Sequence, residues 1–446
     1  MEATLQEILD DREERASKQK ELLAQYGKSL LCFTMNIPGP EKWNRNVAIG
    51  FYLGCWFIED TLKGRPVLYK EKSTGVTGGV AYYVVDLPAK QLKQMVMELE
   101  EIDPIGRLFD MDVLTPEGEK VSRQELGQGP RKCLLCDNDA AICARSRAHG
   151  LDQLKNAVGF YLYVGAREYF TEFISSRAFY ALYQEVNTTP KPGLVDKRNS
   201  GSHKDMTIRH FFVSANALRE YFSRFAEAGF LGRDEDPRET FRKLRPIGME
   251  AEQAMLQATR GVNTHKGAIF SIGLLCAAAG RLSPDQWSAE TLLAECGKMA
   301  EGVVACDFAG VTEENAKTPG ELCYARYGIT GVRGQAEAGF PAVSKVGLPV
   351  LIEGLNKGIS FNDACCAALL HILAATDDTN LIHRSDRQTQ LEIKERIANM
   401  LKDDPYPTAD KIDALDQEFI QKNLSPGGSA DLLAMTLLVY FLRTDE

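Results

Sequence analysis

Two aspartates in the segment at residues 106–113 stand where a metal ion could be held. Asp110 and Asp112 are separated by one residue on a predicted strand, so both side chains point to the same side of the sheet. Two carboxylates held together repel each other unless a cation lies between them. Because Mg²⁺ binds one or two carboxylates together with substrate phosphates, the pair indicates either a magnesium site suited to nucleotidyl transfer or two solvated carboxylates on a strand.

Three cysteines and a histidine follow at short intervals. Cys133, Cys136, Cys143 and His149 have the spacing C-x₂-C-x₆-C-x₅-H, which could form a Cys₃His zinc site. The alternative is a group of small buried or partly reactive thiols, which is a common role for cysteine. The interleaved cations would suit a phosphate pocket or the docking of an acidic carrier protein, and they are Arg131, Lys132, Arg145 and Arg147.

Polar, glycine-bearing segments interrupt the apolar second part of the chain. The first, at residues 185–206, holds Lys191 between two prolines, which stiffen the loop and fix the direction of the ammonium group. The second, at residues 260–267, stands at the start of an apolar helix. Backbone N–H groups at a helix N-terminus attract phosphate, and Lys266 would add a positive charge there.

A third segment of this kind, at residues 328–341, resembles a glycine-rich nest for phosphate, with Arg333 as a bidentate clamp. Glu250 and Glu252, which do not share a helix face, could supply Mg²⁺ ligands, as could the cluster at residues 377–380. None of these segments is a Walker loop or a dinucleotide fingerprint. Each one alone also fits a helix-capping loop with solvated cations, so a polyanion site and a set of capping loops both stay open.

The elements that must position the aspartate pair mix helices with strands. This mixture predicts an α+β or α/β domain, and we expect an α+β domain of nucleotidyltransferase type at residues 1–165. In chain order, the expected elements are an exposed amphipathic helix at 5–26, a short apolar segment at 29–34, a buried helix at 46–62, a hairpin at 66–86, a helix at 90–101 and a strand at 107–113.

The rest of the chain has almost no two-residue alternation, so we expect an all-α domain at residues 166–446. The boundary should fall between His149 and Tyr183, with no long linker. Examples of the helical stretches expected from apolar periodicity are 156–183, 206–228, 246–259, 268–279, 289–306, 346–356, 361–374 and 429–442.

Bulk properties narrow the function classes. A chain of 446 residues predicts two domains, and a net charge of −10 argues against a general nucleic-acid surface. The longest apolar runs are too short to cross a bilayer, so we expect no membrane partner. The first twenty residues lack the apolar centre of a signal peptide, which predicts a cytoplasmic protein whose eleven cysteines are reduced or metal-bound.

Several of these segments carry a resemblance to two known families. Residues 36–40, 106–113, 122–123 and 131–149 resemble the citrate lyase holo-acyl-carrier-protein synthase, also called apo-citrate lyase phosphoribosyl-dephospho-CoA transferase. The three polar segments and residues 377–384 resemble the triphosphoribosyl-dephospho-CoA synthase family. Together the two likenesses cover nearly the whole chain, in the order of the known bifunctional fusion. One departure is Gln335, where the pattern G-x-R-G-E-A-E has glutamate, and it shifts the expected role to Glu337.

The second resemblance implies a synthase acting on ATP and 3′-dephospho-CoA. The ribose 2′-hydroxyl of the coenzyme would join the ribosyl C1 of ATP, and adenine would leave. Such a transfer needs a base, an acid and positive charge around the triphosphate. Phosphate contacts are expected from Lys191, Lys197, Lys266 and Arg333. The base or Mg²⁺ ligands are expected among Glu185, Asp196, Glu252 and Glu337, with His265 as a candidate acid.

The first resemblance implies transfer of the phosphoribosyl-dephospho-CoA group to a serine of the citrate lyase acyl carrier (gamma) subunit, with loss of pyrophosphate. Asp110 and Asp112 would hold Mg²⁺. The expected phosphate contacts are Arg107, Arg123, Arg131 and Arg147. Two alternatives stay open: the equivalent malonate decarboxylase system, which uses the same prosthetic group, and a first domain that is only a zinc-dependent module for docking the carrier.

Overall fold

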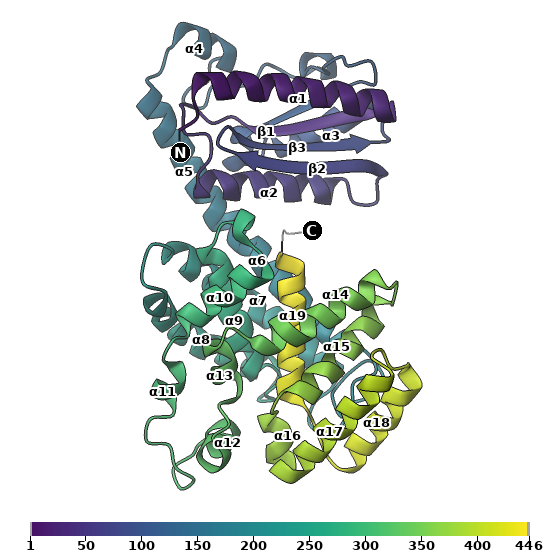
Figure 1. Cartoon of the computed structure of the whole chain (residues 1–446). Coiled ribbons are helices and arrows are strands. Elements are labelled where there is room, and N and C mark those ends of the chain that lie inside the picture. Colours follow the sequence, from purple (N-terminus) through teal and green to yellow (C-terminus); the bar gives the residue numbers. More distant parts are fainter. Residues whose placement is uncertain (1, 444–446) are drawn as a thin grey trace. The chain divides into compact units, whose positions relative to one another are not determined.

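The computed structural model describes residues 2–443, and the chain divides into two compact units, Met1–Phe170 and Thr171–Glu446 (Figure 1). All strands of the described part lie in the first unit, and the described part of the second unit is built from helices. None of the described helices combines the length and the apolar character needed to span a membrane.

The first unit is built on one antiparallel sheet with the strand order β2-β3-β1-β4. Its strands are β1 (Ser29–Met35), β2 (Val67–Gly75), β3 (Gly78–Val85) and β4 (Phe109–Leu114). Every strand pairing is antiparallel, and the helices connect strands without parallel crossovers. The unit is therefore α+β, which is one of the two classes expected from the sequence. The nucleotidyltransferase type of this fold stays a prediction.

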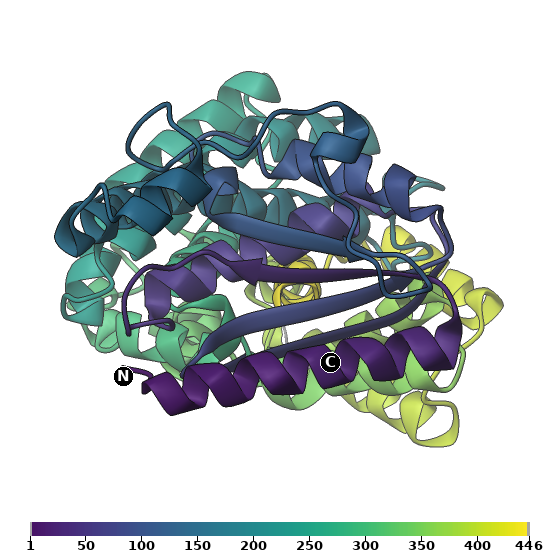
Figure 2. The ribbon, with the colours of Figure 1, turned by 90° about the horizontal axis from the view of Figure 1, so that it is seen from above.

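Helices cover both faces of this sheet. On one face lies α1 (Leu5–Tyr26), whose Leu22 and Leu23 belong to the core cluster that contains Leu30 and Cys32 (Figure 2). On the other face lie α2 (Arg45–Thr61) and α3 (Ala89–Leu99), and Phe51 of α2 stacks on Phe33 at a ring-centroid distance of 5.4 Å. The helix expected at residues 5–26 and the hairpin expected at 66–86 are confirmed.

The remainder of the first unit is short helices and loops after β4. A 3₁₀ turn at Ile105–Leu108 precedes β4, so the strand begins two residues later than expected and Arg107 lies outside it. The other elements are a 3₁₀ turn (Gln124–Leu126), α4 (Ala140–Ser146), α5 (Leu151–Gly165) and a π turn (Ala166–Phe170).

The second unit is a helical domain in which α9 and α19 are buried along most of their length (Figure 1). Both helices are apolar nearly all round, which is typical of helices enclosed by others. The helices are α6 (Thr171–Asn187), α7 (Ile208–Leu231), α8 (Pro237–Ala258), α9 (Lys266–Arg281), α10 (Ala289–Met299), α11 (Val303–Asp307), α12 (Pro319–Tyr327), α13 (Gly331–Glu337), α14 (Leu348–Asn356), α15 (Phe361–Ala375), α16 (Thr379–Arg384), α17 (Arg387–Asp403), α18 (Ala409–Gln421) and α19 (Gly427–Leu442), with a 3₁₀ turn at Pro284–Gln286 and a π turn at Val343–Gly347.

Several expected helix limits are wrong for local reasons. The helix expected from Pro246 begins at Pro237, and Pro246 lies inside it. The stretch expected at residues 289–306 is divided, because α10 ends at Met299 and Gly302, with a φ of 80°, lies at the N-cap of α11. Part of the segment expected to be a phosphate nest, Gly331–Glu337, is helical.

Candidate functional site

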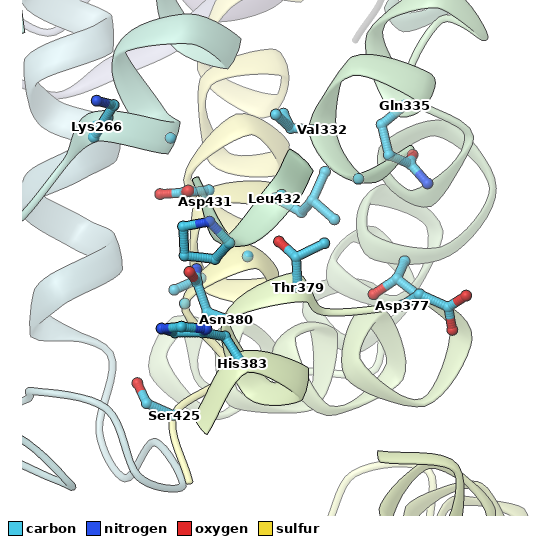
Figure 3. Close-up of a pocket in the computed structure, with 18 of the residues that line it drawn as sticks. Lys266, Val332, Gln335, Asp377, Thr379, Asn380, His383, Ser425, Asp431 and Leu432 are labelled. Atoms are coloured by element: carbon cyan, nitrogen blue, oxygen red, sulfur yellow. The ribbon is translucent and has the colours of Figure 1, made fainter. Parts of the chain in front are cut away.

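A cavity of about 1060 Å³ opens in the second unit and gathers residues from distant parts of the sequence (Figure 3). Six lysine and arginine residues line it against three carboxylates, an excess of three positive charges in a chain whose net charge is −10. The cavity can therefore hold a large polyanion. The lining cations are Lys191, Lys266, Lys317, Arg384, Arg387 and Lys394, and the lining carboxylates are Glu185, Asp377 and Asp431.

A buried ion pair joins the end of α6 to the first polar segment. Lys191 is 1% exposed and Glu185 is 4% exposed. The Lys191 Nζ donates to the backbone oxygen of Glu185 at 2.9 Å and also to its carboxylate. Burial raises the pKa of Glu185, while the lysine opposes that shift. Both expected residues thus reach the cavity wall as a pair.

Asp196 has a different environment, because its carboxylate organises the loop rather than facing the cavity. It accepts hydrogen bonds from the backbone N–H groups of Lys191 at 3.1 Å and Arg198 at 2.7 Å. Asp196 is buried and does not line the cavity, and Lys197 beside it is exposed to solvent. The structure therefore brings Lys191, but neither Asp196 nor Lys197, to the cavity.

The start of α9 forms another part of the wall. His265, at the N-cap position, is 3% exposed, and its Nδ1 lies 2.6 Å from the hydroxyl of Ser214. Burial, helped by the charge of Lys191, lowers the pKa of His265 to about 3, so the imidazole is neutral near pH 7. Its Nε2 has no hydrogen-bond partner among the described residues.

Lys266 follows His265 and lines the cavity with a largely exposed side chain. Its Nζ lies 2.6 Å from the carboxylate of Glu252 on α8, which does not itself line the cavity. Glu250, two residues earlier on α8, instead pairs with Arg224 at 2.7 Å on the exposed surface. The positive end of the α9 dipole and Lys266 together make this corner attractive to phosphate.

The wall formed around α16 carries most of the other cations. Arg384 donates to the backbone oxygen of Ser202 at 3.0 Å and lies 3.1 Å from Nδ1 of His203. Asp377 is held between Arg387 and Lys394, each at 2.8 Å. The sequence had indicated residues 377–384 as part of a site, but Arg387 and Lys394 were not foreseen.

Arg333 and Glu337 of the third polar segment do not line the cavity. Arg333 pairs with Asp307 at 2.7 Å and lies over the ring of Phe308. The Glu337 carboxylate accepts hydrogen bonds from the backbone N–H groups of Gly302 and Val304 at 3.1 Å each, which caps α11. Other residues of the same segment line the cavity, among them Thr330, Val332 and Gln335, and the Gln335 side chain accepts a hydrogen bond from the backbone N–H of Ala342.

Asp431 on α19 lines the cavity and was not singled out from the sequence. Figure 3 shows its carboxylate directed toward the side of the cavity where Lys266 lies. Burial, followed by the charges of Glu185 and Asp378, raises its pKa well above the ordinary value. Asp431 is the one charged residue in the otherwise apolar helix Gly427–Leu442, and that isolated charge was the available indication.

In the first unit, Asp110 and Asp112 point to the same side of the sheet, as predicted. The register pairs Asp112 with Cys32 and Asp110 with Thr34, on the face that α1 covers. Lys120 lies 2.6 Å from Asp112, and Arg131 lies 3.7 Å from Asp110. Burial and the neighbouring Asp112 raise the pKa of Asp110, so the pair favours a bound cation.

Asp110 also borders a smaller cavity of about 210 Å³ beside α1. Three cations line it, Arg12, Arg15 and Lys42, which the sequence had not indicated. Arg12 and Arg15 belong to a helix that reads as an exposed amphipathic surface, and Lys42 belongs to the loop before α2. The sheet register places Asp110 beside them.

The other expected arginines of the first unit have structural partners. Arg107 donates to the backbone oxygen of Cys133 and lies over the ring of Tyr161. Arg123 pairs with Glu100 and Glu101. Arg147 ends α4 in the left-handed conformation and is exposed. Of the four expected arginines, the structure brings Arg131 to the aspartate pair.

The cysteines and histidine of the C-x₂-C-x₆-C-x₅-H segment do converge. Potential ligand atoms of Cys133, Cys136, Cys143 and His149 all lie within 4.8 Å of one another. The Cys136 Sγ is 3.6 Å from the Cys143 Sγ and 3.4 Å from the His149 Nε2. The segment can therefore hold one metal ion between four ligands.

Comparison with known proteins gives two family matches. Residues 171–446 match the CitG family model, described as ATP:dephospho-CoA triphosphoribosyl transferase. Residues 3–162 match the CitX family model, described as apo-citrate lyase phosphoribosyl-dephospho-CoA transferase. The two matched regions fall within the two compact units.

Two relatives align with nearly the whole chain, and a third aligns with about two thirds of it. A protein named CitXG from Haemophilus influenzae is 35% identical over 99% of this chain and 96% of its own length. Another of the same name from Leuconostoc mesenteroides subsp. cremoris is 33% identical over 98% of this chain and 96% of its own length. The 2-(5''-triphosphoribosyl)-3'-dephosphocoenzyme-A synthase of Haemophilus ducreyi is 36% identical over 69% of this chain and 98% of its own length.

Proposed function

Because this chain belongs to the family of fused CitX and CitG proteins, it is a bifunctional transferase that makes and attaches the citrate lyase prosthetic group, and we propose that each unit works through the cavity described above. The second unit joins ATP to dephospho-CoA. The first unit transfers the resulting phosphoribosyl-dephospho-CoA group to apo-citrate lyase. The matched transferase families support catalysis in the first unit rather than a docking module, and they favour citrate lyase over the malonate decarboxylase system.

The observation that carries the synthase assignment is the positively charged cavity at the start of α9. Both substrates are polyphosphates, and the reaction brings two such groups into one site. Six cations against three carboxylates offset this charge, and a volume of about 1060 Å³ is in the upper range for ligand sites. We assign the triphosphate of ATP to Lys266 and the α9 N-terminus, and the coenzyme phosphates to the wall with Arg384.

Other expected residues receive supporting roles in this proposal. Lys191 keeps the buried Glu185 paired and lends its charge to the cavity wall. His265 is neutral and offers one ring nitrogen to a bound nucleotide, so it acts as a hydrogen-bonding group rather than as a charged acid. The proposal gives no substrate contact to the five expected residues outside the lining, which are Asp196, Lys197, Glu252, Arg333 and Glu337.

For the transferase step, we assign the phosphates to the cations that surround Asp110, which are Arg12, Arg15, Lys42 and Arg131. The acceptor is a serine hydroxyl of the acyl carrier (gamma) subunit, and pyrophosphate leaves. Asp110 and Asp112 fit Mg²⁺ because they share one face and the charge of Asp112 raises the pKa of Asp110. A bound Mg²⁺ would neutralise charge on the leaving pyrophosphate.

The metal of the Cys₃His segment is proposed to be zinc in a structural site. Tetrahedral zinc with thiolate and imidazole ligands places the ligand atoms about 3.5–3.8 Å apart, close to the separations of 3.6 and 3.4 Å found here. The fourth ligand closes the site, so it would not activate water. Zinc would instead fasten the loop that carries Arg131 toward Asp110.

Metal analysis tests the zinc proposal. Emission spectroscopy of the purified protein is expected to find about one zinc per chain, and the variant with Cys133→Ser and Cys136→Ser is expected to lose it. Cys306, which is exposed and outside the segment, supplies the control Cys306→Ser. If the double variant retained zinc, Cys133 and Cys136 would not be zinc ligands and the proposed site would be wrong.

One incubation tests the whole function. The protein is mixed with ATP, Mg²⁺ and dephospho-CoA, with and without apo acyl carrier subunit. Adenine release without carrier, and a gain of the prosthetic-group mass on a carrier serine when carrier is added, are the expected results. Failure to release adenine would overturn the synthase step, and adenine release without a mass gain on the carrier would overturn the transferase step.

A further inference from the structure

The three carboxylates that line the cavity of the second unit differ in what holds them. Glu185 is paired with the buried Lys191, and Asp377 is paired with both Arg387 and Lys394. Asp431 makes no hydrogen bond or ion pair with the residues that the structure describes. Of the three, it is the carboxylate whose oxygens remain available to a substrate.

Close packing at the start of α9 fixes the position of this free carboxylate. Oδ2 of Asp431 occupies the space where a side chain at residue 267 would begin, and Gly267 leaves that space open. The carboxylate therefore lies beside the first turn of α9, next to Lys266, where we place the triphosphate of ATP (Figure 3). A group held there is close to the ribose to which that triphosphate is attached.

The charges around Asp431 suit a proton acceptor. Glu185 and Asp378 are the acidic neighbours that act on it, and together with burial they raise its pKa well above the ordinary value. Lys191, in the loop after α6, and Lys266, at the start of α9, are cations that line the same cavity. A carboxylate that binds protons more tightly than usual is a better general base, provided that it is ionised when the substrate binds.

Resting on the synthase function proposed above, we propose that Asp431 is the general base that activates the ribose 2′-hydroxyl of dephospho-CoA. Its carboxylate takes the hydroxyl proton while the oxygen forms a bond to C1 of the ATP ribose. The bond from C1 to N9 of adenine breaks, and its electron pair goes to adenine, which takes one proton from solvent. Asp431 returns its proton to solvent as the products leave, so atoms and charge balance.

The test compares Asp431→Asn with the control Asp410→Asn, an exposed aspartate at the start of α18. Asparagine keeps the size of the side chain beside Gly267 but cannot accept the proton. We expect kcat for adenine release to fall by about 10²–10⁴-fold, the usual loss for a general base, with little change in KM for either substrate. The control should keep the wild-type rate.

Two further measurements separate catalysis from folding and binding. Calorimetric titration with ATP should show that Asp431→Asn still binds the nucleotide, and formate should restore part of the activity of Asp431→Ala by filling the vacated site. In the wild type, kcat/KM for adenine release should fall at low pH because Asp431 becomes protonated. This acidic limb of the pH profile should be absent from Asp431→Asn.

Other outcomes of these experiments would contradict the proposal that Asp431 is the general base. The proposed role of Asp431 would be overturned by any of three results in Asp431→Asn: a wild-type kcat, an effect confined to KM, or an acidic limb of the pH profile that persists. If the wild-type protein itself releases no adenine, the synthase proposal fails instead, so the two failures are distinguishable.

Discussion

At the residue scale, the buried pair of Glu185 and Lys191 shows how a loop can be fixed at the edge of a polyanion site. Each partner is nearly inaccessible to water, and the lysine also bonds the backbone of the residue with which it pairs. An isolated charge in that place would be costly, whereas the pair keeps an ammonium group at the cavity wall. The two prolines beside Lys191 limit how far the loop can relax if the pair is broken.

Breaking this pair should therefore destabilise the second unit. Lys191→Met leaves the Glu185 carboxylate buried without its partner and should lower the free energy of unfolding by about 3–5 kcal/mol. Lys197→Met, six residues along in the same segment and exposed, should change it by less than about 0.5 kcal/mol. Urea denaturation measures the free energy of unfolding of the two variants. Equal losses of stability would contradict the stabilising role of the Glu185–Lys191 pair.

Residue types identified much of the site, but their partners did not follow from the sequence. Lys191, Lys266 and the aspartate pair on β4 were predicted from local spacing, which the folded chain preserves. Asp431 was overlooked because α19 reads as an apolar core helix, and Arg12 because α1 reads as a solvated surface. In both cases a distant element brings the charge to the site, and local spacing cannot contain that information.

At the element scale, the third polar segment lines the cavity with some of its residues and supports a neighbouring helix with another. Its helix α13 directs Gln335 toward the cavity and Glu337 toward the start of α11. Two glycines of this segment, Gly331 and Gly339, have positive φ and lie close to Thr379 of α16 and Leu293 of α10, so they permit close approach to neighbouring helices. This is why a glycine-rich motif with a central arginine was interpreted as a phosphate clamp, whereas Arg333 pairs with Asp307.

A substitution at Glu337 separates these roles. Glu337→Gln weakens the cap of α11 and should lower the free energy of unfolding by about 1 kcal/mol, while adenine release stays within about threefold of wild type. Thermal unfolding measures the change in stability, and the rate of adenine release with both substrates present measures the change in activity. A loss of more than about a hundredfold in kcat with unchanged stability would return Glu337 to the catalytic machinery.

Helices α9 and α15 were predicted well because both are apolar over most of their length, and α1 was predicted from leucines at helical spacing among charged residues. The helices α12, α16, α17 and α18 were not among the stretches named. Of these, α12 and α16 are short helices whose first turns are capped by Thr318 and Asp378. The continuation of α8 through Pro246 was also missed, since tertiary packing overrides a local breaker.

At the scale of the whole molecule, each compact unit contains a separate cavity with its own cations and carboxylates. The sequence predicted two parts and their classes from a change in periodicity. It could not give the size of either cavity, because both are lined by segments that are far apart in the chain. The two reactions need only share their intermediate.

Complementation tests this division. Asp112→Asn should abolish transfer to the carrier but not adenine release, and Asp431→Asn should do the reverse. A mixture of the two variants should restore carrier loading, because the intermediate made by one protein can diffuse to the other. Carrier loading that stays absent from the mixture, while each variant keeps its own half-reaction, would contradict free exchange of the intermediate.

The walls of the synthase cavity have one more consequence, for the growing polypeptide. The last wall, α19, is translated long after the first unit is finished, roughly 15 to 55 seconds later at ordinary rates of protein synthesis. On the proposed assignment of the cavity, we expect a nascent chain not to consume nucleotide until that helix has left the ribosome, although all residues of the first unit have by then been translated. A ribosome that stalls late on the message would thus produce a protein able to use the intermediate but unable to make it.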